Sequence, residues 1–148
     1  MEKLSFPVMW FGGRTIGVSF DWADLTTCTP TAFRHGFYKG LLIVDSSGQL
    51  LRVKEARKIG YPTRFLGFGI HKVGKKGPRI IMRLITVEPN FESEVLTLEL
   101  SDFKARVISA MTKERDSWSE CMMSWHEMKD LIGQAKSFEE VMRLPFLQ

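Results

Sequence analysis

The pattern of hydrophobic and polar positions changes once along the chain, near residue 100. Before that point, short apolar runs alternate with polar residues and are separated by Gly, Pro, Ser and Asn, which is typical of strands and turns. After it, apolar residues recur every three or four positions, which is typical of helices with one buried face. The pattern predicts an α+β fold: a mainly antiparallel sheet of about five to seven strands, followed by two or three C-terminal helices packed on one face.

Two hairpins are predicted in the first third of the chain. Residues 6–11 and 15–20 favour strands, and Gly12-Gly13 between them favours a tight turn. The second hairpin has a strand at 40–45, a turn at 46–49 and a returning strand through Leu51 and Val53. Between the hairpins, residues 21–40 resist assignment beyond one helical turn at 22–26.

The segment after the second hairpin predicts one short helix and three strands. Residues 55–59 are interpreted as a helix that ends at Gly60, because Gly favours helix ends and Pro62 prevents continuation. Strands are expected through Leu66, Phe68 and Ile70, at 79–87 after a turn at 74–78, and at 95–100 after Pro89-Asn90.

Three helix starts are predicted in the last third. Ser101 is placed to cap a helix whose apolar face contains Phe103, Val107, Ala110 and Met111. Ser124 with Glu127, and Ser137 with Glu140, have the spacing of capping boxes, in which the serine accepts from a backbone N–H and the glutamate reaches back.

Length and composition indicate one domain. The chain has 148 residues, of which 44% are hydrophobic and 26% charged, so a single core spanning 1–148 is expected, mostly β over 1–100 and mostly α over 101–148. No apolar run approaches the roughly 20 residues that cross a bilayer, and the N-terminus has no signal-type apolar region. We therefore expect a soluble, cytoplasmic protein without a membrane partner, in which Cys28 and Cys121 are thiols.

Charge is distributed unevenly. Residues 52–83 contain ten lysines and arginines but one acidic residue, Glu55, whereas residues 84–148 contain seven basic and twelve acidic side chains. The basic segment is interpreted as a solvated face, as a nucleic-acid surface, or as a contact for an acidic partner. Its candidate phosphate-binding residues are Arg57, Lys58, Arg64, Lys72, Lys75 and Lys76.

The near-matches to catalytic motifs each lack a required residue. Residues 69–76 (GIHKVGKK) resemble a P-loop, but Lys76 replaces the hydroxyl that holds Mg²⁺. His126-Glu127 begins like a zinc-protease helix, but Asp130 stands where the second histidine belongs. We therefore expect no catalytic residues, no metal and no cofactor, and interpret the chain as a binding protein rather than an enzyme.

Trp22 is the candidate anchor for a protein partner. It is flanked by Asp21 and Asp24 in the unassigned connection, and an aromatic residue between carboxylates on a loop is a common form of interface anchor.

Three stretches of the chain resemble the small immunity proteins of bacterial toxin systems. Residues 37–56 (FYKGLLIVDSSGQLLRVKEA) contain an apolar strand ending in Asp45, a turn with Gly48 and a returning strand. Residues 98–104 (LELSDFK) begin a helix, and residues 135–144 (AKSFEEVMRL) contain the closing one.

The resemblance implies a non-enzymatic protein that binds one cognate toxin domain and occludes its active site. Many such toxins are basic nucleases, which favours an acidic binding surface. That surface would draw on Glu88, Glu92, Glu94 and Glu99 together with Asp21 and Asp24. The basic middle of the chain departs from this expectation, and the alternative is a small nucleic-acid-binding module that uses residues 52–83.

Overall fold

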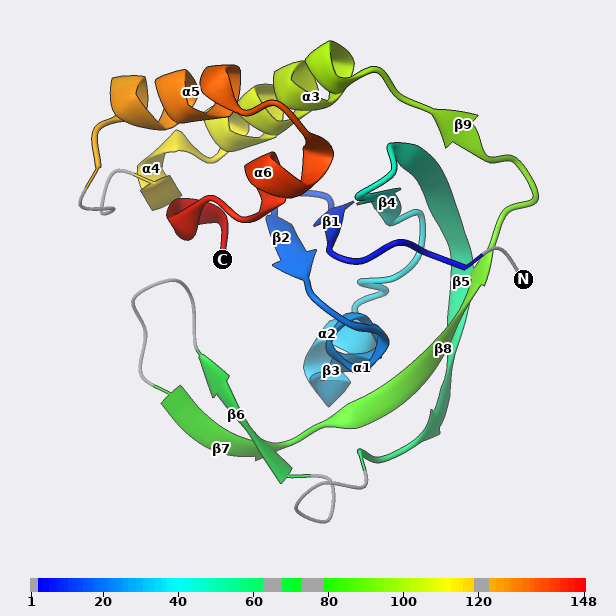
Figure 1. The fold of residues 1–148 in the computed structure, drawn as a ribbon. Coiled ribbons are helices and arrows are strands. Elements are labelled where there is room, and N and C mark those ends of the chain that lie inside the picture. The colour runs from blue at the N-terminus through cyan, green and yellow to red at the C-terminus, as the bar shows by residue number, and fades with distance from the viewer. Residues whose placement is uncertain (1–2, 63–67, 73–78, 119–122) are drawn as a thin grey trace.

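A computed structural model describes residues 3–62, 68–72, 79–118 and 123–148 (Figure 1). Strands come first and the longer helices last, so the predicted α+β fold is confirmed. The strands are β1 (Val8–Phe11), β2 (Ile16–Ser19), β3 (Thr27–Cys28), β4 (Leu42–Asp45), β5 (Gln49–Gly60), β6 (Phe68–Lys72), β7 (Arg79–Arg83), β8 (Ile85–Phe91) and β9 (Leu96–Thr97). The helices are α1 (Trp22–Thr26), α2 (Pro30–Arg34), α3 (Leu100–Lys113), α4 (Arg115–Trp118), α5 (Trp125–Gln134) and α6 (Phe138–Met142), followed by a 3-10 turn at Pro145–Leu147.

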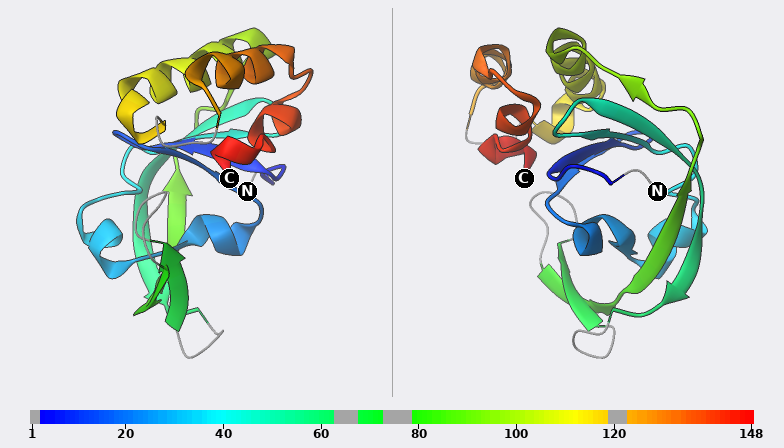
Figure 2. Two further views of the ribbon diagram at one scale, coloured as in Figure 1. Left: turned by 90° about the vertical axis from the view of Figure 1, so that its left-hand side faces the viewer. Right: turned by 45° about the vertical axis from the view of Figure 1, so that its right-hand side comes forward.

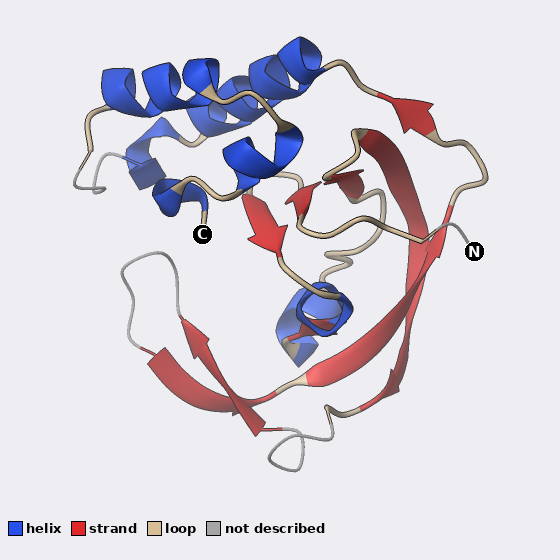
Figure 3. Cartoon of the chain, viewed as in Figure 1, coloured by secondary structure: helices blue, strands red, loops and turns tan. Residues whose placement is uncertain are grey.

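The main sheet is antiparallel and strongly curled (Figure 3). Its strand order is β2-β1-β4-β5-β8-β3, and β9 pairs with the start of β5. β5 changes partner along its length, pairing with β4 through residues 50–52 and with β8 through residues 53–60. The register shifts twice along the β5–β8 pair, and such irregularities bend a strand, so β5 carries the sheet around a corner.

Side chains of the central strands alternate between two hydrophobic clusters, one on each face of the sheet. Figure 2 shows the backbone of the sheet and of the C-terminal helices from two further directions. In β1, Met9 belongs to the first cluster and Val8 to the second. In β4, Val44 belongs to the first cluster and Ile43 to the second. The first cluster lies under α3, α5 and α6 and includes Phe103, Val107, Met128, Ile132 and Val141. The C-terminal helices therefore cover one sheet face, as predicted.

Residues 21–40, for which the sequence predicts little beyond one helical turn, supply residues to the second cluster. The expected helical turn at 22–26 is confirmed as α1. Leu25 and Tyr38 are buried there against the sheet residues Ile85 and Val87, and the Tyr38 hydroxyl donates to the Leu25 carbonyl at 2.9 Å. The sheet is therefore packed on both faces.

The helix predicted at 55–59 is wrong. These residues continue β5, and Ala56 and Arg57 pair with Pro89 and Glu88 of β8. Pairing with a strand distant in sequence overrides the local helix signal. Pro89 is tolerated within β8 because β3 pairs with residues 85 and 86 alone, which leaves β8 an edge strand beside the proline.

Other strands are shorter than predicted. The strand predicted at 79–87 is divided at Leu84 into β7 and β8, and the strand predicted at 95–100 is reduced to Leu96–Thr97. β6 pairs with β7, whereas Leu66 and the turn at 74–78 lie outside the described residues.

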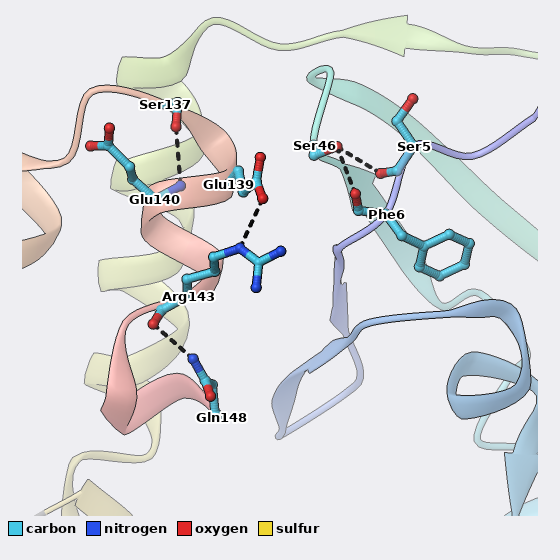
Figure 4. A network of polar contacts seen from close by, with 8 residues as sticks. All are labelled: Ser5, Phe6, Ser46, Ser137, Glu139, Glu140, Arg143 and Gln148. Carbon is cyan, nitrogen blue, oxygen red and sulfur yellow. Dashed lines mark hydrogen bonds and ion pairs between the residues drawn. The ribbon is translucent and has the colours of Figure 1, made fainter.

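The predicted cap at Ser101 is also wrong. α3 begins at Leu100 with Glu99 in the capping position, so Ser101 lies inside the first turn. The Ser124 box is confirmed, because Ser124 and Glu127 form both of its hydrogen bonds. The Ser137 box is confirmed in part: the Ser137 hydroxyl accepts from the Glu140 N–H at 3.1 Å (Figure 4), but the Glu140 carboxylate accepts from the Lys136 N–H rather than from Ser137.

Buried polar contacts fix the second hairpin. Asp45 is fully buried, and its carboxylate accepts from the backbone N–H groups of Ser5, Ser47 and Gln49. The neighbouring Ser46 hydroxyl donates to the Ser5 carbonyl at 2.9 Å (Figure 4), so the turn holds the segment that leads into β1.

In the part of the chain that the structure describes, no helix combines the length and apolarity needed to cross a bilayer.

Candidate functional site

The first candidate surface surrounds the start of α1, where Asp21, Trp22 and Asp24 lie together as the sequence placed them. The Asp21 carboxylate caps α1 by accepting from the Asp24 N–H at 2.8 Å. The Asp24 carboxylate in turn accepts from the Phe20 N–H at 3.0 Å. These reciprocal bonds satisfy free backbone donors at the helix start and fix the conformation of residues 20–24.

Two large aromatic side chains project from this fixed backbone. Trp22 is 41% exposed, which confirms that it lies at the surface, and Phe20 is 38% exposed. The Arg143 guanidinium lies 5.5 Å from the centre of the Phe20 ring. We call residues 20–22 the anchor segment, because exposed aromatic residues on ordered backbone are typical of binding hot spots.

Asp24 is the perturbed acid of this surface. Partial burial raises the pKa of its carboxyl group by removing solvent from the charged form, the hydrogen bond from the Phe20 N–H lowers the pKa, and the nearby Asp21 charge raises it. Burial and the Asp21 charge therefore destabilise the ionised form of Asp24, and the hydrogen bond from Phe20 offsets part of that effect.

Two of the three predicted acidic residues at 88, 92 and 94 pair with arginines of the basic strand β5. Val87 of β8 is buried in the same cluster as Leu25 of α1. The next residue, Glu88, points to the opposite face of the strand and is exposed. Glu88 accepts from the Arg57 Nε at 2.6 Å, and Glu92 lies 3.8 Å from Arg52. Glu94 follows β8 and is exposed. Glu88 and Glu92 therefore pair with Arg57 and Arg52 of β5, respectively.

The predicted basic surface is described in part. Arg57 is paired with Glu88, and Lys58 and Arg83 lie 4.4 Å and 3.9 Å from the ring centre of the exposed Tyr61. The hydrogen bond from Lys58 and the charges of Arg83 and Lys58 lower the pKa of the Tyr61 hydroxyl. Stacking of a base on that ring would compete with these cations. The remaining predicted residues, Arg64, Lys75 and Lys76 and the side chain of Lys72, lie outside the described part of the chain.

A basic cleft that sequence reasoning missed lies between the β1–β2 turn and α3. Its volume is about 670 Å³, and its walls come from residues 11–16, residues 37–42 and the outer face of α3. It is lined by one acidic residue, Asp102, and by four cationic residues: Arg14, Lys39, Arg106 and Lys113. We call it the basic cleft.

A sequence signal for one wall of this cleft exists. Asp102, Arg106, Ser109 and Lys113 recur at helical spacing on the face of α3 opposite the buried Phe103, Val107 and Met111. Arg14 and Lys39 come from loops distant in sequence, so no local pattern links them to α3.

The described thiol and histidines show no activated nucleophile. Cys28 is half-buried beside Tyr38, and loss of solvent raises the pKa of its thiol, so the neutral form prevails at physiological pH. His126 is exposed, with Nε2 3.4 Å from Asp130 one helical turn away. Within the described ranges, no group of three His, Cys, Asp or Glu side chains is arranged to hold a metal ion.

These surfaces therefore offer an aromatic anchor, a charge-paired strand face and a basic cleft. Comparison of the chain with protein-family models, with curated proteins and with solved structures finds no match.

Proposed function

We propose that this chain is a non-enzymatic immunity protein that binds a cognate bacterial toxin domain in the cytoplasm and occludes its active site. The observation that carries the proposal is the anchor segment, in which Phe20 and Trp22 are exposed on backbone fixed by Asp21 and Asp24. Large aromatic side chains supply most of the binding energy of many protein interfaces.

Preorganisation strengthens this argument. A loop that must order on binding loses conformational entropy, which weakens the complex. Here the two carboxylates already hold the backbone, so that loss is small and burial of the Trp22 ring contributes more fully to affinity. The same carboxylates add negative charge beside the anchor, which would speed association with a basic toxin.

The nucleic-acid alternative is less favoured by the described residues. Arg57 and Arg52, on the strand that should contact phosphates, face Glu88 and Glu92 instead. Binding to phosphates falls steeply and log-linearly with salt, whereas an interface anchored by packed aromatics weakens much less. A salt titration of any complex that forms therefore distinguishes the two functions.

The direct test begins with the reading frame upstream of this chain, which we expect to end in a toxin-like domain. That domain is then produced together with the chain. We expect the wild-type chain to restore growth and to form a complex of the purified proteins. Trp22→Ala should weaken that complex by about 2 kcal/mol or more, roughly thirtyfold in Kd, because an anchor side chain is lost.

The matched control is Tyr61→Ala, which removes a ring that is 43% exposed but lies outside the anchor segment. It should leave the Kd unchanged, and urea unfolding should show both variants folded. The proposal would be excluded if the two variants raised the Kd equally. It would also be excluded if the wild-type chain neither restored growth nor formed a complex with the toxin domain.

A further inference from the structure

The basic cleft has the dimensions of a small-molecule site. Its volume of about 670 Å³ lies within the roughly 300–1,000 Å³ of typical ligand pockets. Three elements distant in sequence form it, and the half-buried ring of Phe37 and the side chain of Leu42 add apolar surface to its wall. The cleft can thus accommodate an organic group as well as an ion.

Its four cations outnumber its one carboxylate, that of Asp102. None of Arg14, Lys39, Arg106 and Lys113 forms an ion pair with any described residue. By contrast, Arg52, Arg57 and Arg143 each have a carboxylate partner. Four cations around one concavity give it a positive potential, which attracts an anion.

The types of cation indicate the ligand chemistry. Arginine presents a planar fork that matches the oxygens of a phosphate, and lysine acts as a mobile point charge. The glycines at 12 and 13 leave the turn without side chains, so a ligand can approach the backbone there.

We propose that the basic cleft binds a small molecule that carries two or more linked phosphate groups. Arg106 and Arg14 contact phosphate oxygens, Lys39 and Lys113 neutralise the remaining charge, and Phe37 contacts any organic portion. The site shares no residue with the anchor segment, so it is a second binding function, and its failure would leave the proposed toxin binding untouched.

The test is calorimetric titration of the full chain with inorganic tripolyphosphate and with ATP, using adenosine as the uncharged probe. We expect both phosphorylated probes to bind and adenosine not to bind. Tighter binding of ATP than of tripolyphosphate would assign a nucleotide, and equal binding would assign polyphosphate itself; both outcomes support the shared chemistry.

Two kinds of variant locate the site. Arg106→Ala and Lys113→Ala should each weaken binding about tenfold, because each removes a charge-assisted contact. Gly13→Asp should also weaken it by adding a negative charge to the cleft, and it should fold normally because a side chain at Gly13 meets no atom within 4 Å.

The matched control is Lys129→Ala, which removes an exposed cation of α5 that does not line the cleft. It should leave the affinity unchanged. The proposal is overturned if neither phosphorylated probe binds at millimolar concentration, or if Lys129→Ala weakens binding as much as Arg106→Ala. It is also overturned if duplex DNA binds while tripolyphosphate does not.

Discussion

Two carboxylates show how differently burial is compensated in this molecule. Asp45 is fully buried, but its oxygens accept from Ser5, Gln49 and both the N–H and the hydroxyl of Ser47. Asp24 is half-exposed and accepts one backbone N–H, from Phe20. A buried charge is tolerated when its hydrogen bonds are satisfied. At Asp24, partial burial and the nearby Asp21 charge raise the pKa of the carboxyl group.

Asp24→Asn should therefore stabilise the fold at neutral pH, since the amide oxygen can still accept from Phe20. A raised folded-state pKa means that stability from this group is full below the unfolded value of 3.8 and is lost as pH rises through the folded pKa. The difference between variant and wild type should be near zero at about pH 3.5 and should grow towards pH 7, measured by urea unfolding. A variant less stable at pH 7 would show that the charge itself is favourable.

At the scale of elements, the helix starts allow a paired comparison of two serines. Ser124 caps α5 with both bonds of a capping box, whereas Ser101 lies within the first turn of α3. We expect Ser124→Ala to lower the free energy of unfolding by about 1 kcal/mol. Ser101→Ala should instead raise the free energy of unfolding by a few tenths of a kcal/mol, because alanine has a higher helix propensity than serine. Equal losses in denaturant unfolding would contradict the assignment of the helix starts.

The elements that the sequence predicts correctly are those with local signals. Gly12-Gly13 and the turn at Gly48 define the two hairpins, and the Ser124 box defines α5. The continuation of β5 through Arg57 depends on β8, about thirty positions away, so local pattern could not show it. Thr29-Pro30 is a local pattern typical of a helix start, and in the structure Thr29 caps α2 with Pro30 in the first turn.

The candidate sites divide in the same way. The exposure of Trp22 could be inferred from its polar neighbours, which are local. The pairing of Glu88 with Arg57 and the gathering of Arg14 with Arg106 depend on tertiary contacts between distant segments. Charge counts along the chain therefore predicted neither the neutralised strand face nor the basic cleft.

At the scale of the whole molecule, one sheet supports two hydrophobic clusters. Ile132 belongs to the cluster under the C-terminal helices and Ile43 to the cluster on the other face, and each is 0–1% exposed. Neither layer can pack without the sheet between them, so unfolding should be cooperative.

Ile132→Ala and Ile43→Ala should each lower the free energy of unfolding by about 2–5 kcal/mol, because each leaves a cavity in a packed core. Each should still give a single transition, and each should reduce hydrogen-exchange protection in both layers. If Ile43→Ala left the protection of α3 and α5 unchanged, the two clusters would be independent folding units.

The change of partner along β5 has a consequence for how the chain is made. During synthesis, β4 is available at once to pair with residues 50–52, but β8 emerges from the ribosome well after residues 53–60. Until then this stretch is an open edge that another nascent chain could join. The exposed charges of Lys54, Arg57 and Lys58 oppose such pairing and so protect the unfinished chain from aggregation. Arg57 gains its partner Glu88 only when β8 arrives.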